Sequence, residues 1–415
     1  MPSVRKSLLQ LVFSGTSMKR WNDKMRPMEL MEVDKQAHKM IMAWVLYTLN
    51  GSHLDRESFI ALGDRIVRGG IYDYFYRLVI TDIKPPVFYQ IKANPAHYRQ
   101  LTGWVLEQLK PRVQSLGESF WQGMREYYED EGKDVLLSHN ILQAAHLLAS
   151  RWEFHLIKGL NPHDEEMNEI ENNFIRGIAT HEDLVGVQEL MQGNGAQLGR
   201  FIQLCGQLRF QKRWSQTPRI PETSVLGHMF IVACYGYFFS LTVEACKARR
   251  VNNFFAGLFH DIPEVLTRDI ISPVKSSVKG IGDLIKEYEF KEMDAKIFRT
   301  LEAGGYFELS QRLKYFLGVE VGSEFAATII QNGETRKVDW NQIQNQYNKD
   351  EFDPKDGFML KICDDLAAFI EAYTATRNGI TNDQLQQALG NIRKKYQQTS
   401  LTETMHIGGL LADFD

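Results

Sequence analysis

Apolar residues recur every three or four positions along most of the chain, and strict alternation of apolar and polar residues is scarce. This spacing is typical of helices that bury one face. Turn-forming pairs such as Asn50-Gly51 and Asn161-Pro162 separate the periodic segments. We therefore predict an all-α fold, with its longest helices in residues 38–49, 99–115, 135–157, 197–210, 225–246, 283–301 and 357–376.

One segment, 225–243, is apolar over almost the length that a membrane span requires. It carries His228 and Gly236, however, and it follows the polar stretch Glu222-Thr223-Ser224. This composition fits a buried core helix better than a membrane span. The apolar stretch near the amino terminus is too short to cross a membrane and lacks a small-residue cleavage site. We expect a cytoplasmic protein with no membrane partner.

Composition narrows the class further. At 415 residues the chain exceeds the usual size of one core, so two domains are expected. The net charge of -4 provides no general attraction to nucleic acid. The four cysteines show no CxxC spacing and mostly lie in apolar helical segments, which favours reduced core residues over zinc ligands or disulfides.

Three short blocks occur in the same order in both halves of the chain and indicate an internal repeat. The matched blocks are Arg20-Trp21, Pro27 and His38 with Arg213-Trp214, Pro218 and His228; residues 81–87 with 268–274; and the helix around His146 with the helix around Asp364. We predict two tandem copies of one helical bundle, at 1–185 and 195–415. The polar stretch 177–196 would join them.

The two copies differ where chemistry is expected. Alignment of Asp82 with Asp269 places Asp73-Tyr74 opposite His260-Asp261, and Arg77 opposite Glu264. An arginine at this position would repel a metal ion and could not act as a base. We expect the first copy to be catalytically silent and to serve packing, dimerisation or ligand sensing. The alternative is a second metal site built from His38, Asp82, His139 and His146.

The adjacent pair His260-Asp261 is the most informative motif of the second half. His228 precedes it on an apolar run, and Asp364 follows it on another, next to Asp365. An aspartate among apolar neighbours needs a cation or a paired charge if it is buried. Periodicity does not decide whether Asp364 or Asp365 is the candidate ligand. Two imidazoles and two carboxylates suit one divalent ion of Mn, Co, Fe, Ni or Zn. No histidine occurs between Asp261 and Asp364, which favours one metal over two.

Residues around this motif suggest hydrolysis. A metal site of this kind lowers the pKa of bound water and polarises a phosphoryl oxygen. Glu264 lies four residues after His260, on the same face if the helix continues, and could take a proton from that water. Arg213 could clamp a phosphate, Trp214 could offer a flat face to a base or sugar, and Lys275 could add a second phosphate contact.

These motifs resemble a known family. The segments RW, ETSVLGH, HDIPEVLTRDIISPVK, KEYEFKEMD and LKICDDLAAF, within residues 197–400, are similar to those of the HD-domain phosphohydrolases and, among them, the bacterial 5'-deoxynucleotidases. The resemblance implies that His228, His260, Asp261 and Asp364 hold the metal ion.

The resemblance also implies roles for the surrounding side chains. Glu264 would orient or activate water, and Arg213 would bind the phosphate. Trp214 would favour a 2'-deoxy sugar, and Asp269 would contact the nucleotide.

The expected function follows from this likeness: hydrolysis of 2'-deoxynucleoside 5'-monophosphates to nucleoside and phosphate. One alternative keeps the metal site but changes the substrate to an alarmone, a nucleoside di- or triphosphate or another phosphomonoester. A second alternative is a non-catalytic, nucleotide-sensing scaffold with a structural metal. The expected partner is a small-molecule nucleotide rather than nucleic acid or a membrane, and a homodimer stays open.

Overall fold

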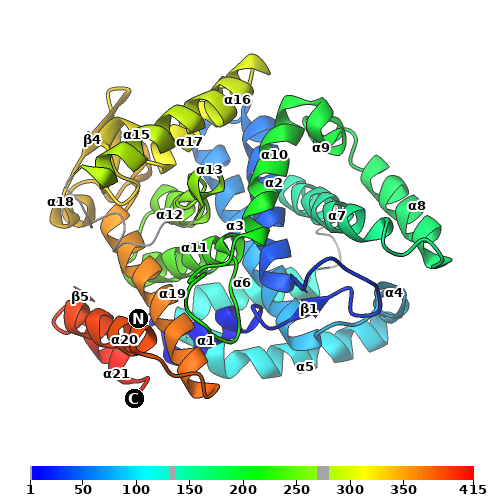
Figure 1. Ribbon diagram of the computed structural model, residues 1–415, viewed down its shortest axis with the longest axis horizontal. Coiled ribbons are helices and arrows are strands. Elements are labelled where there is room, and N and C mark those ends of the chain that lie inside the picture. Colours follow the sequence, from blue (N-terminus) through cyan, green and yellow to red (C-terminus); the bar gives the residue numbers. More distant parts are fainter. Residues whose placement is uncertain (1, 131–135, 269–279) are drawn as a thin grey trace.

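The computed structural model describes residues 2–130, 136–268 and 280–415, and it confirms the all-α prediction (Figure 1). The helices are α1 (Lys6–Ser14), α2 (Glu32–Gly51), α3 (Arg56–Ile80), α4 (Pro85–Ala93), α5 (Pro95–Val113), α6 (Glu118–Glu129), α7 (Leu137–Lys158), α8 (Glu166–Ala179), α9 (Val187–Met191), α10 (Gln197–Gln207), α11 (Val225–Thr242), α12 (Lys247–Phe259), α13 (Glu264–Thr267), α15 (Ile281–Met293), α16 (Arg299–Ala303), α17 (Phe307–Phe316), α18 (Trp340–Asn345), α19 (Gly357–Arg377), α20 (Asp383–Tyr396) and α21 (Ile407–Ala412).

Strands are few and short in the described part of the chain. They form three antiparallel two-stranded pairs: β1 (Lys19–Arg20) with β2 (Leu30–Met31), β3 (Thr328–Gln331) with β4 (Glu334–Lys337), and β5 (Ser400–Thr402) with β6 (Met405–His406). The helices supply most of the core, to which the strand residues Leu401 and Met405 add.

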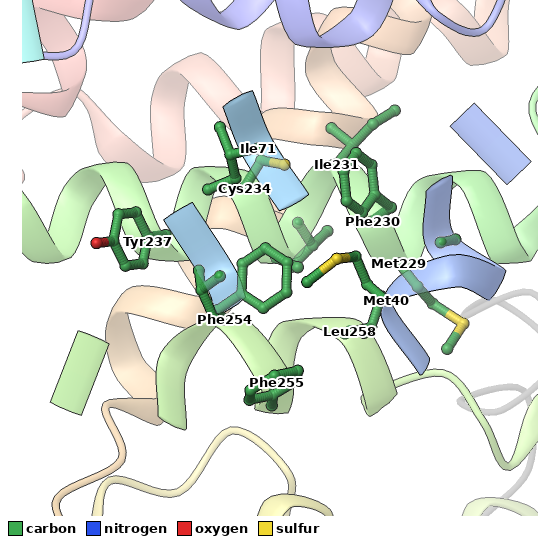
Figure 2. Packing of buried hydrophobic residues seen from close by; sticks show 14 of the residues in the cluster. Met40, Ile71, Met229, Phe230, Ile231, Cys234, Tyr237, Phe254, Phe255 and Leu258 are labelled. Atoms are coloured by element: carbon green, nitrogen blue, oxygen red, sulfur yellow. The ribbon is translucent and has the colours of Figure 1, made fainter. Parts of the chain in front are cut away.

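The main core is one cluster of buried residues drawn from both halves of the chain, and a smaller cluster consists of Leu30, Phe154, Ile157 and Met167. Helix α11 packs against α2, α12 and α19. Figure 2 shows Met40 of α2, Ile71 of α3, and Phe230 and Phe254 of α11 and α12 converging in this core. Helix α11 is apolar and long enough to span a membrane, but 94% of it is buried inside the protein, as expected for a core helix. The four cysteines are free thiols, three of them buried.

The start of α11 is set by Ser224 and Gly227. The Ser224 hydroxyl accepts a hydrogen bond from the Gly227 amide at 2.8 Å and donates to Asp34 of α2 at 2.6 Å. A Cβ on Gly227 would lie 2.7 Å from an Asp34 carboxylate oxygen, so glycine lets the amino termini of α2 and α11 meet. This cap places His228 in the first turn of α11.

Helix α12 ends at Phe259, earlier than the sequence pattern suggested. Pro263 has no amide hydrogen, and in a continued helix its ring would clash with the carbonyl of Phe259, four residues earlier. His260 becomes the carboxy-terminal cap, and a new short helix, α13, begins at Glu264. The prediction that His260 and Glu264 share one helical face is therefore wrong.

The two halves share several backbone features. Lys19 pairs with Met31, and Lys212 forms an isolated antiparallel bridge with Ser224, at the same separation along the chain. Positive φ occurs in both halves at matched non-glycine residues: Trp21 and Trp214 at 56°, and Thr81 and Arg268 at 59° and 65°.

This register corrects one detail of the sequence comparison. Met31 and Ser224 are the residues that precede α2 and α11. Four residues further on lie Lys35 in the first half and His228 in the second. Alignment of the two bridges thus places Lys35, and not His38, opposite His228. The sequence comparison missed this three-residue offset because the short matched blocks did not show where each helix begins.

Candidate metal centre

Three helices bring the four predicted ligands together. His228 comes from α11, His260 and Asp261 from the end of α12, and Asp364 from the middle of α19. One donor atom from each of His228, His260 and Asp261 lies within 4.8 Å of the others. Oδ1 of Asp364 lies 3.0 Å from Nε2 of His228 and 3.9 Å from Nε2 of His260. His228 and Asp364, which are 136 positions apart in the sequence, thus lie side by side in the fold.

The donor set fits a divalent ion. Nδ1 of His260 lies 2.8 Å from the Gly257 carbonyl, so it carries the proton and donates, and Nε2 is left to face the cluster. That Nε2 is buried, has no hydrogen-bond partner among the residues that the structure describes, and lies 3.2 Å from Oδ2 of Asp261. A cation between the imidazole lone pair and the facing carboxylate oxygens would satisfy them all. Nitrogen and oxygen donors from four side chains suit Mn, Co, Fe, Ni or Zn.

Electrostatics at the cluster favour positive charge. Burial alone would lower the pKa of His260, but the Asp261 carboxylate raises it to about 9. Burial would raise the pKa of Asp261, yet His260 holds it well below its usual value. The carboxylates of Asp261 and Asp364 remain charged in this environment, and their field would stabilise a bound cation.

Arg213 and Trp214 border the cluster, as predicted. Nη1 of Arg213 lies 3.3 Å from Oδ2 of Asp261, and its Nε lies 3.5 Å from Oε2 of Glu371. The Trp214 indole donates to the same Glu371 oxygen at 2.7 Å. Burial would lower the pKa of Arg213, but Glu371 and Asp261 raise it, so the guanidinium stays charged beside the cluster.

Glu371 is a site residue that the sequence motifs did not identify. It is almost fully buried, it accepts from Thr223 at 2.5 Å, and its Oε1 lies 3.8 Å from Nδ1 of His228. Arg213 and Trp214 complete its contacts. The available signal was its position: a single acid in an apolar stretch, seven residues after Asp364 and so on the same helical face. Glu371 positions the side chains around the ligands.

Lys361 was not identified either. It lies one turn before Asp364 on α19, and its ammonium contacts the carboxylates of Asp364 at 2.7 Å and Asp365 at 3.0 Å. The same ammonium lies 4.9 Å from the centre of the Phe325 ring, which itself faces the His260 ring at 5.8 Å. A second cationic side chain, besides Arg213, therefore stands at the rim of the cluster.

The remaining predicted residues have different outcomes. Glu264 is partly buried at the start of α13, close enough to Arg213 to help raise the pKa of that guanidinium. Asp269 and Lys275 lie outside the described residues. The structure thus tests neither the nucleotide contact assigned to Asp269 nor the phosphate contact assigned to Lys275.

The matching region of the first half holds a different cluster. Arg20 contacts Glu153 at 2.8 Å and Glu32 at 2.7 Å, and Lys39 contacts Asp73 at 2.5 Å. The Trp21 indole donates to Glu153 at 3.1 Å, as that of Trp214 does to Glu371.

A lysine and a histidine meet at the centre of this cluster. Nζ of Lys35 lies 2.7 Å from Nδ1 of His146, where the second half has His228 against Asp364. In the described residues, the metal-type grouping of histidine and acid side chains occurs at His228, His260 and Asp261 and not in the first half. The alternative site of His38, Asp82, His139 and His146 therefore does not form in the described structure.

Comparison with known proteins supports this geometry. The family model of the HD domain matches residues 205–393, which contain all four candidate ligands. No curated protein and no solved structure matched the chain. Together, the family match and the His-Asp cluster support the assignment of the second half of the chain to an HD-domain family, whose members are generally metal-dependent phosphohydrolases.

Proposed function

We propose that the protein hydrolyses 2'-deoxynucleoside 5'-monophosphates to nucleoside and phosphate, with one divalent ion held by His228, His260, Asp261 and Asp364. The convergence of these four side chains is the observation that carries the proposal, with Asp364 3.0 Å from His228 and Asp261 3.2 Å from His260. A purely structural metal would not need an acid and an arginine beside it.

The surrounding side chains suit phosphate release. When bound, the ion supplies a Lewis acid that polarises the phosphoryl oxygen and the attacking water. Arg213 presents a charged guanidinium beside Asp261 and would bind the phosphate through paired hydrogen bonds. Glu264 would orient water and accept its proton. Lys361 stands at the rim and would offset the phosphate charge.

The likeness of Trp214 to the family motif supports a nucleotide rather than another phosphomonoester. Its backbone has φ of 56°, a left-handed conformation that is uncommon outside glycine, and its indole is fixed by Glu371. A left-handed backbone and a hydrogen bond to the buried Glu371 carboxylate fix the ring next to Arg213 in the chain. The ring would contact the sugar at its 2' position.

A phosphate-release panel tests this proposal. Purified protein loaded with Mn²⁺ or Co²⁺ would be offered the four 2'-deoxynucleoside 5'-monophosphates, their ribose counterparts, nucleoside di- and triphosphates and an alarmone. We expect the deoxynucleoside monophosphates to have the highest kcat/KM. Preference for a triphosphate or an alarmone would reassign the substrate. No release from any member would support the scaffold alternative.

We further propose that the first half is a degenerate copy of the same domain. The matched strand bridges and positive-φ residues support this common ancestry of the backbone. In the first copy, Lys35 and Arg77 stand where the second has His228 and Glu264. Lys35 and Arg77 bring positive charge to the places of a ligand and a base, so the copy would neither bind metal nor catalyse.

A further inference from the structure

A cavity away from the metal centre is lined by several basic side chains. Its volume is about 470 Å³, within the range of small-molecule sites. Its walls come from the amino-terminal segment, α3, the loop and first turn of α6, and the region where α11 leads into α12. Three arginines from three separate segments, Arg5, Arg68 and Arg250, line it.

The charges of these arginines are only partly balanced. Nε of Arg68 is shared between the Tyr237 hydroxyl at 3.0 Å and Asp64 at 3.2 Å. Nε of Arg250 is buried and has no hydrogen-bond partner in the described part of the chain. A buried nitrogen without an acceptor is costly, and a bound anion would supply acceptors to the partly buried guanidinium groups of Arg68 and Arg250.

The first turn of α6 adds neutral donors to the same wall. Gly117 precedes the helix with φ of 100°, and no side chain caps it. Gly117, Glu118, Ser119 and Phe120 line the cavity, and the first amides of a helix have no acceptor within that helix. The helix dipole also favours negative charge at this end, although the exposed Glu118 at the rim opposes it.

We propose that this cavity binds a phosphorylated small molecule, with Arg250 and Arg68 as the inner contacts and Arg5 at the mouth. Guanidinium groups match the geometry of phosphate oxygens, and three of them suit a ligand with more than one negative charge. The Ser115 hydroxyl oxygen also lines the cavity, buried and without a hydrogen-bond partner among the described residues. Together with the exposed Ser119 and the α6 amides, it completes a polar lining.

The cavity is separate from the metal centre although the same two helices reach both. Helix α11 has His228 near its start and Leu241, a cavity residue, near its end, which corresponds to about 20 Å along the helix. Helix α12 has Arg250 in its first turn and His260 at its other end. A ligand in the cavity would therefore not compete directly with a substrate at the metal centre.

Calorimetric titration with inorganic pyrophosphate tests the site. The full-length Asp261→Asn variant serves as the background, because pyrophosphate also binds metal ions and the loss of this ligand removes the metal centre. We expect this variant to bind pyrophosphate, and we expect Arg5→Ala with Arg250→Ala to weaken that binding at least about tenfold.

A matched control separates a built site from general charge. Arg176 of α8 and Arg336 of β4 are exposed and lie outside the cavity, and replacing both with alanine removes the same total charge. We expect that pair to leave affinity within about twofold, because distant exposed charges are screened by salt. Arg5→Glu, at an exposed position that folding tolerates, should weaken binding on its own.

Two results would overturn the proposal. One is an absence of pyrophosphate binding in the Asp261→Asn background. The other is binding that the Arg5/Arg250 and Arg176/Arg336 pairs weaken equally. Binding lost only in the cavity variants would establish the site independently of whether the metal centre hydrolyses nucleotides.

Discussion

Two buried clusters of charged residues, one in each half of the chain, occupy matching places in the backbone and have opposite designs. In the first half, Arg20 and Lys39 are neutralised by Glu32, Glu153 and Asp73 at 2.5–2.8 Å. In the second half, acids and imidazoles face one another around Asp261, and Arg213 and Lys361 contact the carboxylates from the rim. The first cluster pairs basic side chains with acids, whereas the second offers a donor set that suits a divalent cation.

The difference shows how few positions decide between structure and function. Both halves keep an arginine-tryptophan pair anchored by a buried glutamate, Glu153 or Glu371. Among the positions that change is the residue one turn into the following helix, Lys35 or His228. The first half fills this position with a lysine whose amine contacts His146 at 2.7 Å and whose pKa burial lowers. The second half places an imidazole there, a group that can donate a lone pair to a metal ion.

The largest predicted effect comes from converting one cluster into the other. His228→Lys would place an ammonium beside Asp364 and Asp261 and abolish metal binding. We expect phosphate release to fall by roughly 10³-fold or more, because the Lewis acid contributes several kcal/mol. Lys35→His, the mirror change, should leave metal content and activity unaltered. If the Lys35→His variant bound an additional metal ion, the claim that the first cluster cannot hold a metal would be wrong.

Glu264→Gln tests the assignment of the base. The variant should keep its metal and its helical circular dichroism but lose about 10²–10⁴-fold in kcat, the usual contribution of a general base. Arg77→Gln is the matched change in the first half and should leave kcat unchanged. Unchanged turnover in Glu264→Gln would remove this residue from the mechanism while leaving the metal assignment intact.

Arg20→Ala should affect stability and not catalysis. Arg20 contacts the buried carboxylates of Glu32 and Glu153, and its loss would leave both short of a partner. We expect the free energy of unfolding to drop by about 3–5 kcal/mol, the range for breaking a buried ion pair. Urea unfolding measures this, and kcat per folded molecule should remain that of the wild type. A loss of activity without a loss of stability would contradict a purely structural first cluster.

Acid sensitivity should separate the clusters more subtly. Burial would raise the pKa of Glu32, but Arg20, Lys35 and Arg77 lower it from 4.5 to about 2. Because the folded-state pKa is depressed, the stability from this group is present above pH ~4.5 and lost as the pH falls towards 2. It corresponds to on the order of 3 kcal/mol. The Glu32→Gln variant should therefore be less stable at neutral pH, and its free energy of unfolding should change less with pH between 4.5 and 2. If variant and wild type showed the same pH dependence, Glu32 would not be the source of the acid sensitivity.

Much of the fold was predictable because helical periodicity is a local property. The apolar spacing around His228 and Asp364 predicted α11 and α19, and both are core helices. The His-Asp pair and the lone histidine in an apolar run were predictable because this combination is typical of a metal site. The choice of Asp364 over Asp365 came from the resemblance to the HD-domain family. The roles of the ligands, and the two-domain division at 185–195, remain predictions.

The rest depended on long-range contacts or on single interruptions. Glu371 became visible only when α19 placed it against Trp214 and Thr223, which come from a distant loop. The break after His260 depended on Pro263, whose effect on helix length the periodicity concealed. The match of Lys35 to His228 required the strand register. Contacts of this kind form between segments that are distant in the sequence, and a local pattern of residue types does not reveal them.

Metal content per chain tests the central claim most directly. Protein saturated with Mn²⁺, freed of loosely bound ions and measured by mass spectrometry should hold one ion per chain. Asp261→Asn should hold none, and Asp73→Asn, the same substitution in the first cluster, should still hold one. Two ions per chain, or one ion that survives Asp261→Asn, would contradict a single metal centre in the second half.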